Sequence, residues 1–284
     1  MTDGSRRNSL ARGIGVLFIT FVSFNCSICL GFWGQKQYQK IERVSAPVSG
    51  IEAISVKTDS GDITFTVADT NDCNVTATIT AQSFKADDAG RLAEQTRVKL
   101  ELEGNSVQVM VEKPKAGFAD IIAIAYEIII PPGTNVDCET SFGKISLLNI
   151  KGNVTAVTSM GDIKTEGVTG RMQLDTSYGD IDCNGITSSY LAAKSSFGNI
   201  KVAFTDTCPN NLAARLETSF GDIVVVLPSA FAGEIAAKTG FGKITTDVPI
   251  LIKGEINKNK IIGKVGSGNA WLDLKTSFGN VSIK

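Results

Sequence analysis

A six-residue motif that returns seven times between Thr140 and Val281 constrains the fold more than any other feature of the chain. It reads T-S-F-G-K-I ending at Ile145, T-S-M-G-D-I ending at Ile163 and, in its last copy, T-S-F-G-N-V ending at Val281. An outlying copy, T-D-S-G-D-I, ends at Ile63. The motif glycines are Gly61, Gly143, Gly161, Gly179, Gly198, Gly221, Gly242 and Gly279. Their commonest separation, 18 residues, is too short for helical hairpins or propeller blades and predicts the coils of an all-β fold, a β-solenoid.

Equivalent residues of successive coils stack in such a fold, so each motif position becomes a column. The isoleucine column and the column five residues before the glycine are apolar and are predicted to face the core; the second comprises Cys138, Ala156, Leu174, Ala193, Leu216, Ala237 and Leu274. Strict strand alternation then turns the motif threonines inward. It also turns inward the column just before the glycine, which comprises Phe142, Met160, Tyr178, Phe197, Phe220, Phe241 and Phe278. An exposed, sugar-binding aromatic strip is the alternative that alternation disfavours.

The glycine and the Asp, Lys or Asn after it are predicted to form the corner of each coil, with glycine supplying a positive φ. A loop over residues 206–211 accounts for the longer step of 23 residues before Gly221. The step of 37 before Gly279 equals 18 plus 19, which predicts a degenerate copy at Lys260 with Ile262 in the isoleucine column.

Outside the repeat, three local patterns predict other elements. Lys85–Lys99 has the spacing of an amphipathic helix, a short helical insertion among the early coils. Val98–Leu102 and Ser106–Val111 alternate around Glu103-Gly104-Asn105, which indicates a hairpin. Ile121–Ile130 is expected to be a strand ended by Pro131-Pro132-Gly133.

The N-terminal region predicts a membrane tether. Residues 13–33 carry no charge and no proline, and 21 residues at about 1.5 Å each span a bilayer core. Arg6, Arg7 and Arg12 precede them, so residues 1–12 are expected to be a basic cytoplasmic N-terminus and 13–33 a single-pass signal-anchor. Cleavage of this segment as a signal peptide is the alternative. Residues 34–46 are expected to be a linker, and 47–284 a solenoid domain in the periplasm or outside the cell.

Composition excludes several classes of function. The chain has no histidine, which removes Ser-His-Asp and Cys-His catalysis and the histidine zinc motifs. A net charge of −1 offers no basic surface to nucleic acid. Cys73, Cys138, Cys183 and Cys208 lack zinc-site spacing; they either form two disulfides or are buried free thiols. No residue is predicted to be catalytic, cofactor-binding or metal-binding, and no cofactor is expected.

Three stretches together resemble one family. They are Y-E-I-I-I-P-P-G-T-N-V-D-C-E-T-S-F-G-K-I, the repeated S-x-G-D-I, and the closing G-K-V-G-S-G-N-A-W-L-D-L-K-T-S-F-G-N-V-S-I. They are similar to the bacterial putative-adhesin family of β-strand-repeat proteins, a domain of unknown function, from about residue 50 to the C-terminus. The resemblance implies a right-handed β-helix in a secreted or membrane-anchored protein, and it brings no catalytic residues.

The favoured hypothesis is therefore a non-enzymatic cell-envelope protein that serves adhesion, scaffolding or contact with a protein or glycan partner. The alternative is a carbohydrate-active enzyme or a glycan-binding β-helix. In the enzyme, Asp162 and Asp180 on neighbouring corners would act as paired carboxylates, with Asp222 further along. Calcium binding by the same aspartates is disfavoured, because G-G-x-G-x-D is absent. A sensory role through the membrane anchor rests on the expected topology alone.

Overall fold

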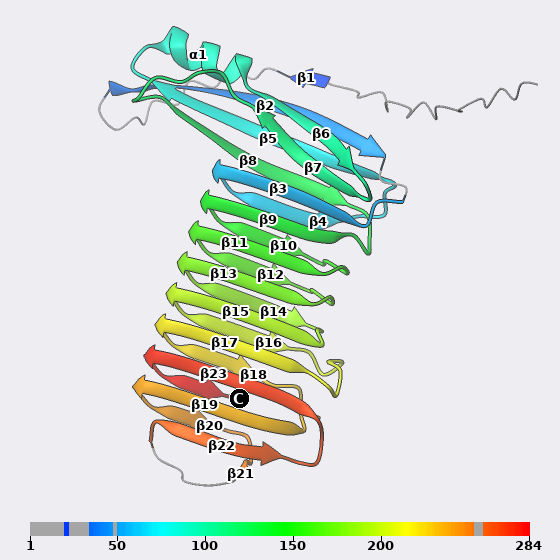
Figure 1. The fold of residues 1–284 in the computed structure, drawn as a ribbon, viewed down its shortest axis with the longest axis vertical. Helices are drawn as coiled ribbons and strands as arrows, with labels where there is room; N and C mark the ends of the chain where they lie inside the picture. Colours follow the sequence, from blue (N-terminus) through cyan, green and yellow to red (C-terminus); the bar gives the residue numbers. More distant parts are fainter. Residues whose placement is uncertain (1–19, 23–33, 48–49, 253–257) are drawn as a thin grey trace, which may run out of the picture.

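The structure is a computed structural model in which residues 20–22, 34–47, 50–252 and 258–284 are described. These residues are mostly in strands and form two long sheets of twelve strands each, with a single helix, α1 (Ala86–Gln95). The sheets lie face to face and run the length of an elongated molecule (Figure 1). The expected solenoid-like, mostly parallel β architecture is therefore confirmed for the repeat.

One sheet contains the strand that follows each motif glycine. In spatial order its strands are β1 (Thr20–Val22), β2 (Lys36–Pro47), β5 (Asp72–Ser83), β8 (Ile121–Ile130), β4 (Ile63–Val67), β10 (Ile145–Leu148), β12 (Ile163–Glu166), β14 (Ile181–Ile186), β16 (Ile200–Phe204), β18 (Ile223–Val226), β24 (Val281–Ile283) and β20 (Ile244–Thr246). From β8 to β20 every pairing is parallel, and motif isoleucines stack directly, as Ile145 does on Ile163.

The other sheet contains the strand that precedes each motif glycine. Its order is β21 (Leu251–Ile252), β22 (Lys260–Val265), β19 (Gly233–Phe241), β23 (Ala270–Phe278), β17 (Ala213–Phe220), β15 (Tyr190–Phe197), β13 (Met172–Tyr178), β11 (Val154–Met160), β9 (Asn135–Phe142), β3 (Ala53–Ser60), β7 (Ser106–Glu112) and β6 (Arg97–Glu103). Residues 206–211 lie in the loop between β16 and β17, as the step before Gly221 predicts.

The core between the sheets is formed by the predicted apolar columns. All seven residues of the Cys/Ala/Leu column are buried, and so are the motif isoleucines except Ile244, which is half-buried on the last coil. The motif threonine positions also face inward, as predicted.

The inward prediction for the column just before the glycine is wrong. Phe220 and its six equivalents are exposed, although Thr218, two residues earlier, is buried. The strand pairing skips the serine between them: Thr158 pairs with Thr140 and Met160 with Phe142, with no pair for Ser159. In each coil the backbone therefore begins to turn one residue before the aromatic position. Strict alternation ends there, and the aromatic side chain points outward.

The C-terminal coils do not stack in chain order. The coil of β23 and β24 lies between the coil of β17 and β18 and the coil of β19 and β20 (Figure 1). The prediction of a degenerate motif copy at Lys260 with Ile262 in the core is wrong, because β22 runs antiparallel to β19 at this end of the sheet and Ile262 is exposed.

An antiparallel cap covers the other end. Strands β2, β5 and β8 form antiparallel pairs, α1 packs on β2 and β5, and the hairpin β6–β7 extends the second sheet (Figure 1). The predicted hairpin and the strand over Ile121–Ile130 are confirmed; the helix is confirmed but ends at Gln95, before Val98 and Lys99 enter β6. The linker expected over 34–46 is wrong, because β2 pairs with β5 along its full length and buries Lys40, Glu42 and Val44.

The membrane-spanning segment predicted over residues 13–33 lies outside the described residues except for Thr20–Val22, which pair with β2. Within the described part of the chain, no helix is both long and apolar enough to cross a bilayer. The signal-anchor, like the handedness of the solenoid, stays a prediction.

Candidate functional site: an exposed aromatic ridge

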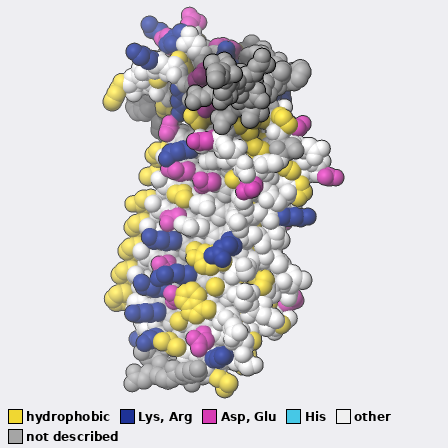
Figure 2. Space-filling view, turned by 45° about the vertical axis from the view of Figure 1, so that its right-hand side comes forward, with side chains coloured by type: hydrophobic (Ala, Val, Ile, Leu, Met, Phe, Trp, Pro, Cys, Tyr) yellow, Lys and Arg dark blue, Asp and Glu magenta, His cyan; other side chains and the backbone are white. Residues whose placement is uncertain are grey.

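The most unusual surface feature is a row of seven large apolar side chains on seven successive coils. We call this row the aromatic ridge; in spatial order it comprises Phe142, Met160, Tyr178, Phe197, Phe220, Phe278 and Phe241. Each member is between 45% and 71% exposed. Hydrophobic side chains gather along the left-hand edge of the molecule in Figure 2, with charged side chains beside them. Seven coils at about 4.8 Å each make a ridge about 30 Å long.

The rings of the ridge stack on one another. From Tyr178 through Phe197, Phe220 and Phe278 to Phe241, neighbouring ring centroids are 4.8–4.9 Å apart and neighbouring planes are within 7° of parallel. Coplanar rings could not approach so closely, so each ring lies against the face of the next. The inner rings therefore have neighbours on both faces and present mainly their edges to solvent.

The motif glycines let the ridge form at this spacing. A side chain added at Gly179 would place Cβ 2.0 Å from the carbonyl oxygen of Gly161 on the adjacent coil, and the corners at Gly161 and Gly198 are equally tight. Only a residue without Cβ allows the coils to approach at this corner. At Gly61 the expected positive φ is also present, at 132°.

The motif threonines fix the same corner from inside. The hydroxyl of Thr158 donates to the carbonyl of Gly143 (3.1 Å), and that of Thr176 donates to the carbonyl of Gly161 (3.0 Å). The same bond recurs at five further coils, where Thr140, Ser195, Thr218, Thr239 and Thr276 donate to the glycine carbonyl of a neighbouring coil. A buried hydroxyl without a partner would cost free energy, so these bonds explain why a polar column lies in the core.

The corner carboxylates proposed as catalytic in the enzyme hypothesis are used by the backbone. Asp162 accepts a hydrogen bond from the amide of Asp180 (2.9 Å), and Asp180 accepts one from the amide of Asn199 (2.7 Å). Asp222 accepts a hydrogen bond from the amide of Asn280 (2.6 Å), and the Asn280 side chain accepts one from the amide of Lys243 (3.0 Å). We call this series the corner column; it comprises Asp62, Lys144, Asp162, Asp180, Asn199, Asp222, Asn280 and Lys243. Aspartate and asparagine both act as acceptors in this column, which favours a structural role for the corner carboxylates over a catalytic one.

A second polar series flanks the other side of the ridge. Four residues before each glycine lies an outward position that we call the charged row: Glu139, Val157, Asp175, Lys194, Glu217, Lys275 and Lys238 in spatial order. Glu217 accepts hydrogen bonds from Arg215 within its own strand (2.9 and 3.1 Å). The ridge is therefore apolar and is bordered by ionic side chains of both signs.

The four cysteines of the described residues do not form a site. Cys73, Cys138, Cys183 and Cys208 are all free thiols, and the first three are buried. Burial raises the pKa of Cys183 to about 12, so its thiolate is scarce at neutral pH. In the described parts of the chain, no three His, Cys, Asp or Glu side chains cluster as a metal site would require.

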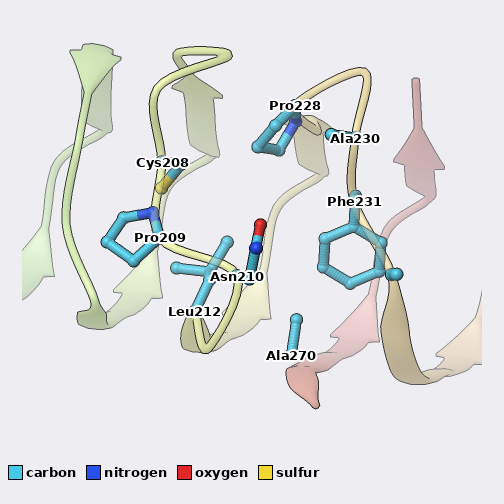
Figure 3. A pocket seen from close by; sticks show the side chains of 9 residues that line it. Cys208, Pro209, Asn210, Leu212, Pro228, Ala230, Phe231 and Ala270 are labelled. Carbon is cyan, nitrogen blue, oxygen red and sulfur yellow. The ribbon is translucent and has the colours of Figure 1, made fainter. Parts of the chain in front are cut away.

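The hollows of the surface are small or shallow. One lies between the loop of Cys208 and Pro209 and the loop that contains Pro228 and Phe231 (Figure 3), and its volume of about 10 Å³ suits a single water molecule. A more open groove of about 560 Å³ lies along β3 and β7. Its charged groups are already paired, because Lys113 lies 2.7 Å from Asp59 and lowers the pKa of that carboxyl group.

Taken together, the fold and the ridge define a solenoid-like β-repeat protein with an apolar surface row. Residues 133–284, just over half of the chain, match the model of the toastrack family DUF4097, and the chain belongs to that family. The match confirms the resemblance of the repeated motifs to a bacterial β-strand-repeat family of unknown function. No curated protein matches the sequence.

The solved structures that are similar to the chain include a putative cell adhesion protein and two putative adhesins. A putative cell adhesion protein from Clostridium sporogenes is 14% identical, with 88% of this chain and 99% of that chain covered and a TM-score of 0.38. A putative adhesin from Bacteroides fragilis is 13% identical, with 86% and 97% covered and a TM-score of 0.44. A putative adhesin from Parabacteroides distasonis is 9% identical, with 86% and 97% covered and a TM-score of 0.31. No activity or ligand follows from likeness of this degree.

Proposed function

We propose that the protein is a non-catalytic contact module of the bacterial cell envelope, and that it binds a protein partner along the aromatic ridge. The exposed ridge carries this proposal. Roughly half of each side chain is exposed, which amounts to about 100 Å² per residue and about 700 Å² for the ridge. Contiguous apolar patches on monomeric proteins seldom exceed about 300–600 Å², and larger ones mark contact sites.

The geometry of the rings favours a protein over a glycan as the partner. Sugars stack on the open face of an aromatic ring, whereas Phe197, Phe220 and Phe278 each have a ring on both faces. The ring edges and the apolar sides of the row remain for contact, and these suit the apolar side chains of another polypeptide. Phe241, at the end of the row, stacks on one neighbour only.

A non-catalytic role fits the chemistry of the surface. The chain has no histidine, and the corner carboxylates accept backbone hydrogen bonds instead of lining a cleft. The uncharged residues 13–33 behind three arginines support a membrane tether with the solenoid outside the cytoplasm. A C-terminal reporter fusion to the full chain should be active only outside the cytoplasm; activity only inside it would contradict the envelope part of the proposal.

Site-specific photo-cross-linking in cells tests the contact part. A photoreactive amino acid is placed at Ser219, next to Phe220 on the ridge, or at Lys201, an exposed outward position on the opposite sheet. We expect protein adducts from position 219 and far fewer from position 201. Equal yields from both positions, or none from position 219, would contradict a protein contact at the ridge.

A further inference from the structure

We infer that the partner is a second copy of this chain, bound antiparallel with the two aromatic ridges in contact and a twofold axis between Phe197 and Phe220. This inference rests on the proposed function, because it requires the ridge to be a contact surface. Area, period and charge support it independently.

The area of the ridge matches a stable dimer. In this arrangement six of the seven ridge residues of each copy overlap, which would bury about 600 Å² on each copy, or about 1,200 Å² in total. Specific protein interfaces bury about 1,200–2,000 Å². Aromatic side chains are also the residues that most often dominate binding energy at interfaces.

The period of the ridge fits another solenoid better than a helix or a strand. Ridge rings repeat every 4.8–4.9 Å. A helix laid along them has a pitch of about 5.4 Å and would drift by about 3 Å over six steps, which is more than half of the ring spacing. Same-face side chains of a strand repeat at about 6.6–6.8 Å. A second copy has the same repeat, so the ridge side chains of the two copies can stay in register over all six coils that overlap.

The charged row selects the orientation and register. In an antiparallel dimer with its axis between the coils of Phe197 and Phe220, the charged row of one copy faces the charged row of the other. Lys194 then faces Glu217, and Asp175 faces Lys275, each pair occurring twice. On the other flank, Asp162 faces Lys243.

Other arrangements bring like charges together. Moving the axis by half a coil spacing in one direction places Lys194 opposite Lys194, and in the other direction Glu217 opposite Glu217. A parallel twofold dimer brings the charged row against the corner column of the same coil, so that Asp175 meets Asp180 and Glu217 meets Asp222. Like-charge contacts of this kind disfavour the wrong register.

Cross-linking between two differently tagged full chains tests the inference. With the photoreactive residue at position 219, we expect an adduct that carries both tags and maps to the segment around Ser196 of the second copy. Phe197→Ser should lower its yield at least about tenfold, since a central aromatic anchor is lost from both copies. Tyr190→Ser, an aromatic substitution at the other end of the same strand β15, should change the yield less than about twofold.

The outcomes separate this inference from the proposed function. An adduct to a different protein would overturn the second copy while leaving the contact function intact. Absence of any protein adduct from position 219 would overturn both. A two-tag adduct that maps elsewhere, or that is equally sensitive to both serine substitutions, would overturn the ridge-to-ridge arrangement.

Charge reversal tests the register without touching the apolar contact. Lys275→Glu should lower the two-tag yield about fivefold by placing Glu against Asp175, and adding Asp175→Lys should restore it. Lys57→Glu lies on the coil beyond the overlap and is the matched control, with no expected change. Equal effects of Lys275→Glu and Lys57→Glu, or failure of the double reversal to restore the yield, would overturn the proposed register.

Discussion

At each corner of the solenoid, three motif residues stabilise the close approach of adjacent coils in different ways. Thr176 donates its hydroxyl proton to the carbonyl of Gly161, which lies on the coil above. Gly179 leaves room for that same carbonyl, and Asp180 accepts the amide of Asn199 on the coil below. The threonine and the aspartate can be replaced within the repeat, by Ser195 and Asn199 for example, because Ser195 keeps the hydroxyl and Asn199 keeps an acceptor oxygen. The glycine has no substitute in any motif copy.

Substitution at this corner should therefore have very unequal effects. Gly179→Val would push Cβ to within 2.0 Å of the Gly161 carbonyl oxygen, so the coils must separate. We expect it to lower the free energy of unfolding by more than about 2 kcal/mol, whereas Asp180→Asn, which keeps the acceptor oxygen, should cost under about 0.5 kcal/mol. Thermal or urea unfolding of the two variants measures the difference. Similar melting of both would show that close approach does not govern the corner.

At the scale of a strand, the sequence predicts the core well until the chain begins to turn. The isoleucine, Cys/Ala/Leu and threonine columns follow alternation because each lies within a regular pleat. The ridge does not, since the pleat ends at the serine before it. A physical signal was nevertheless present: the buried columns mix Ala with Leu, whereas six of the seven ridge residues are aromatic. A core about 10 Å thick that already holds Ile and Leu from each coil has little room for one more ring per coil.

The outward direction of the ridge changes the expected effect of truncating it. Phe220→Ala should remove two stacking contacts but leave no cavity, so we expect a loss of about 1–2 kcal/mol. Leu216→Ala, on the same strand β17 and fully buried, should cost about 2–5 kcal/mol through cavity formation. Unfolding of the two variants, measured at a concentration where any dimer is dissociated, compares them. A loss at Phe220 as large as that at Leu216 would contradict the exposed position of the ring.

The N-terminal cap contains the one buried ion pair that the described residues show. The Lys40 ammonium lies 3.4 Å from the Glu42 carboxylate and donates to the carbonyl of Thr96 (2.8 Å), while the amide of Val98 donates to Glu42 (3.2 Å). These bonds connect β2 to the segment that follows α1. The polar sequence of this region suggests a linker, but Lys40 and Glu42 are buried and pair with each other inside the cap, which is why composition alone misplaces it.

Breaking the pair from one side should be costly. Lys40→Met would leave the Glu42 carboxylate buried without its cation, and we expect a loss of about 3–5 kcal/mol. The double variant Lys40→Met and Glu42→Leu removes both charges and should recover a large part of that loss. Chemical denaturation of the single and double variants provides the measurement. If the double variant is no more stable than the single one, the pair does not act as a unit.

At the scale of the whole molecule, the sequence predicts the coils but not their order. Coils with nearly identical motifs can stack on one another in any spatial order, so the repeat alone cannot show that β23 lies between β17 and β19. The coil of β19 and β20 does carry marks of an end coil. Gly240 replaces the motif serine, and Ile244 is only half-buried. Atypical end repeats are expected where stacking stops.

This order predicts how the C-terminal end depends on the last coil. Deleting residues 269–284 removes β23 and β24, which are the strands that join β19 and β20 to the rest of the solenoid. We expect the amides of β19 to lose protection from hydrogen exchange and to exchange about as fast as those of exposed loops. Strand β11, several coils away, should keep its protection and is the internal reference. Mass spectrometry of peptides covering Gly233–Phe241 and Val154–Met160 in the deleted and full chains gives the comparison. Retained protection in β19 would mean that it can pair directly with β17, and that the inserted position of β23 is a preference among similar coils and not a requirement of the fold.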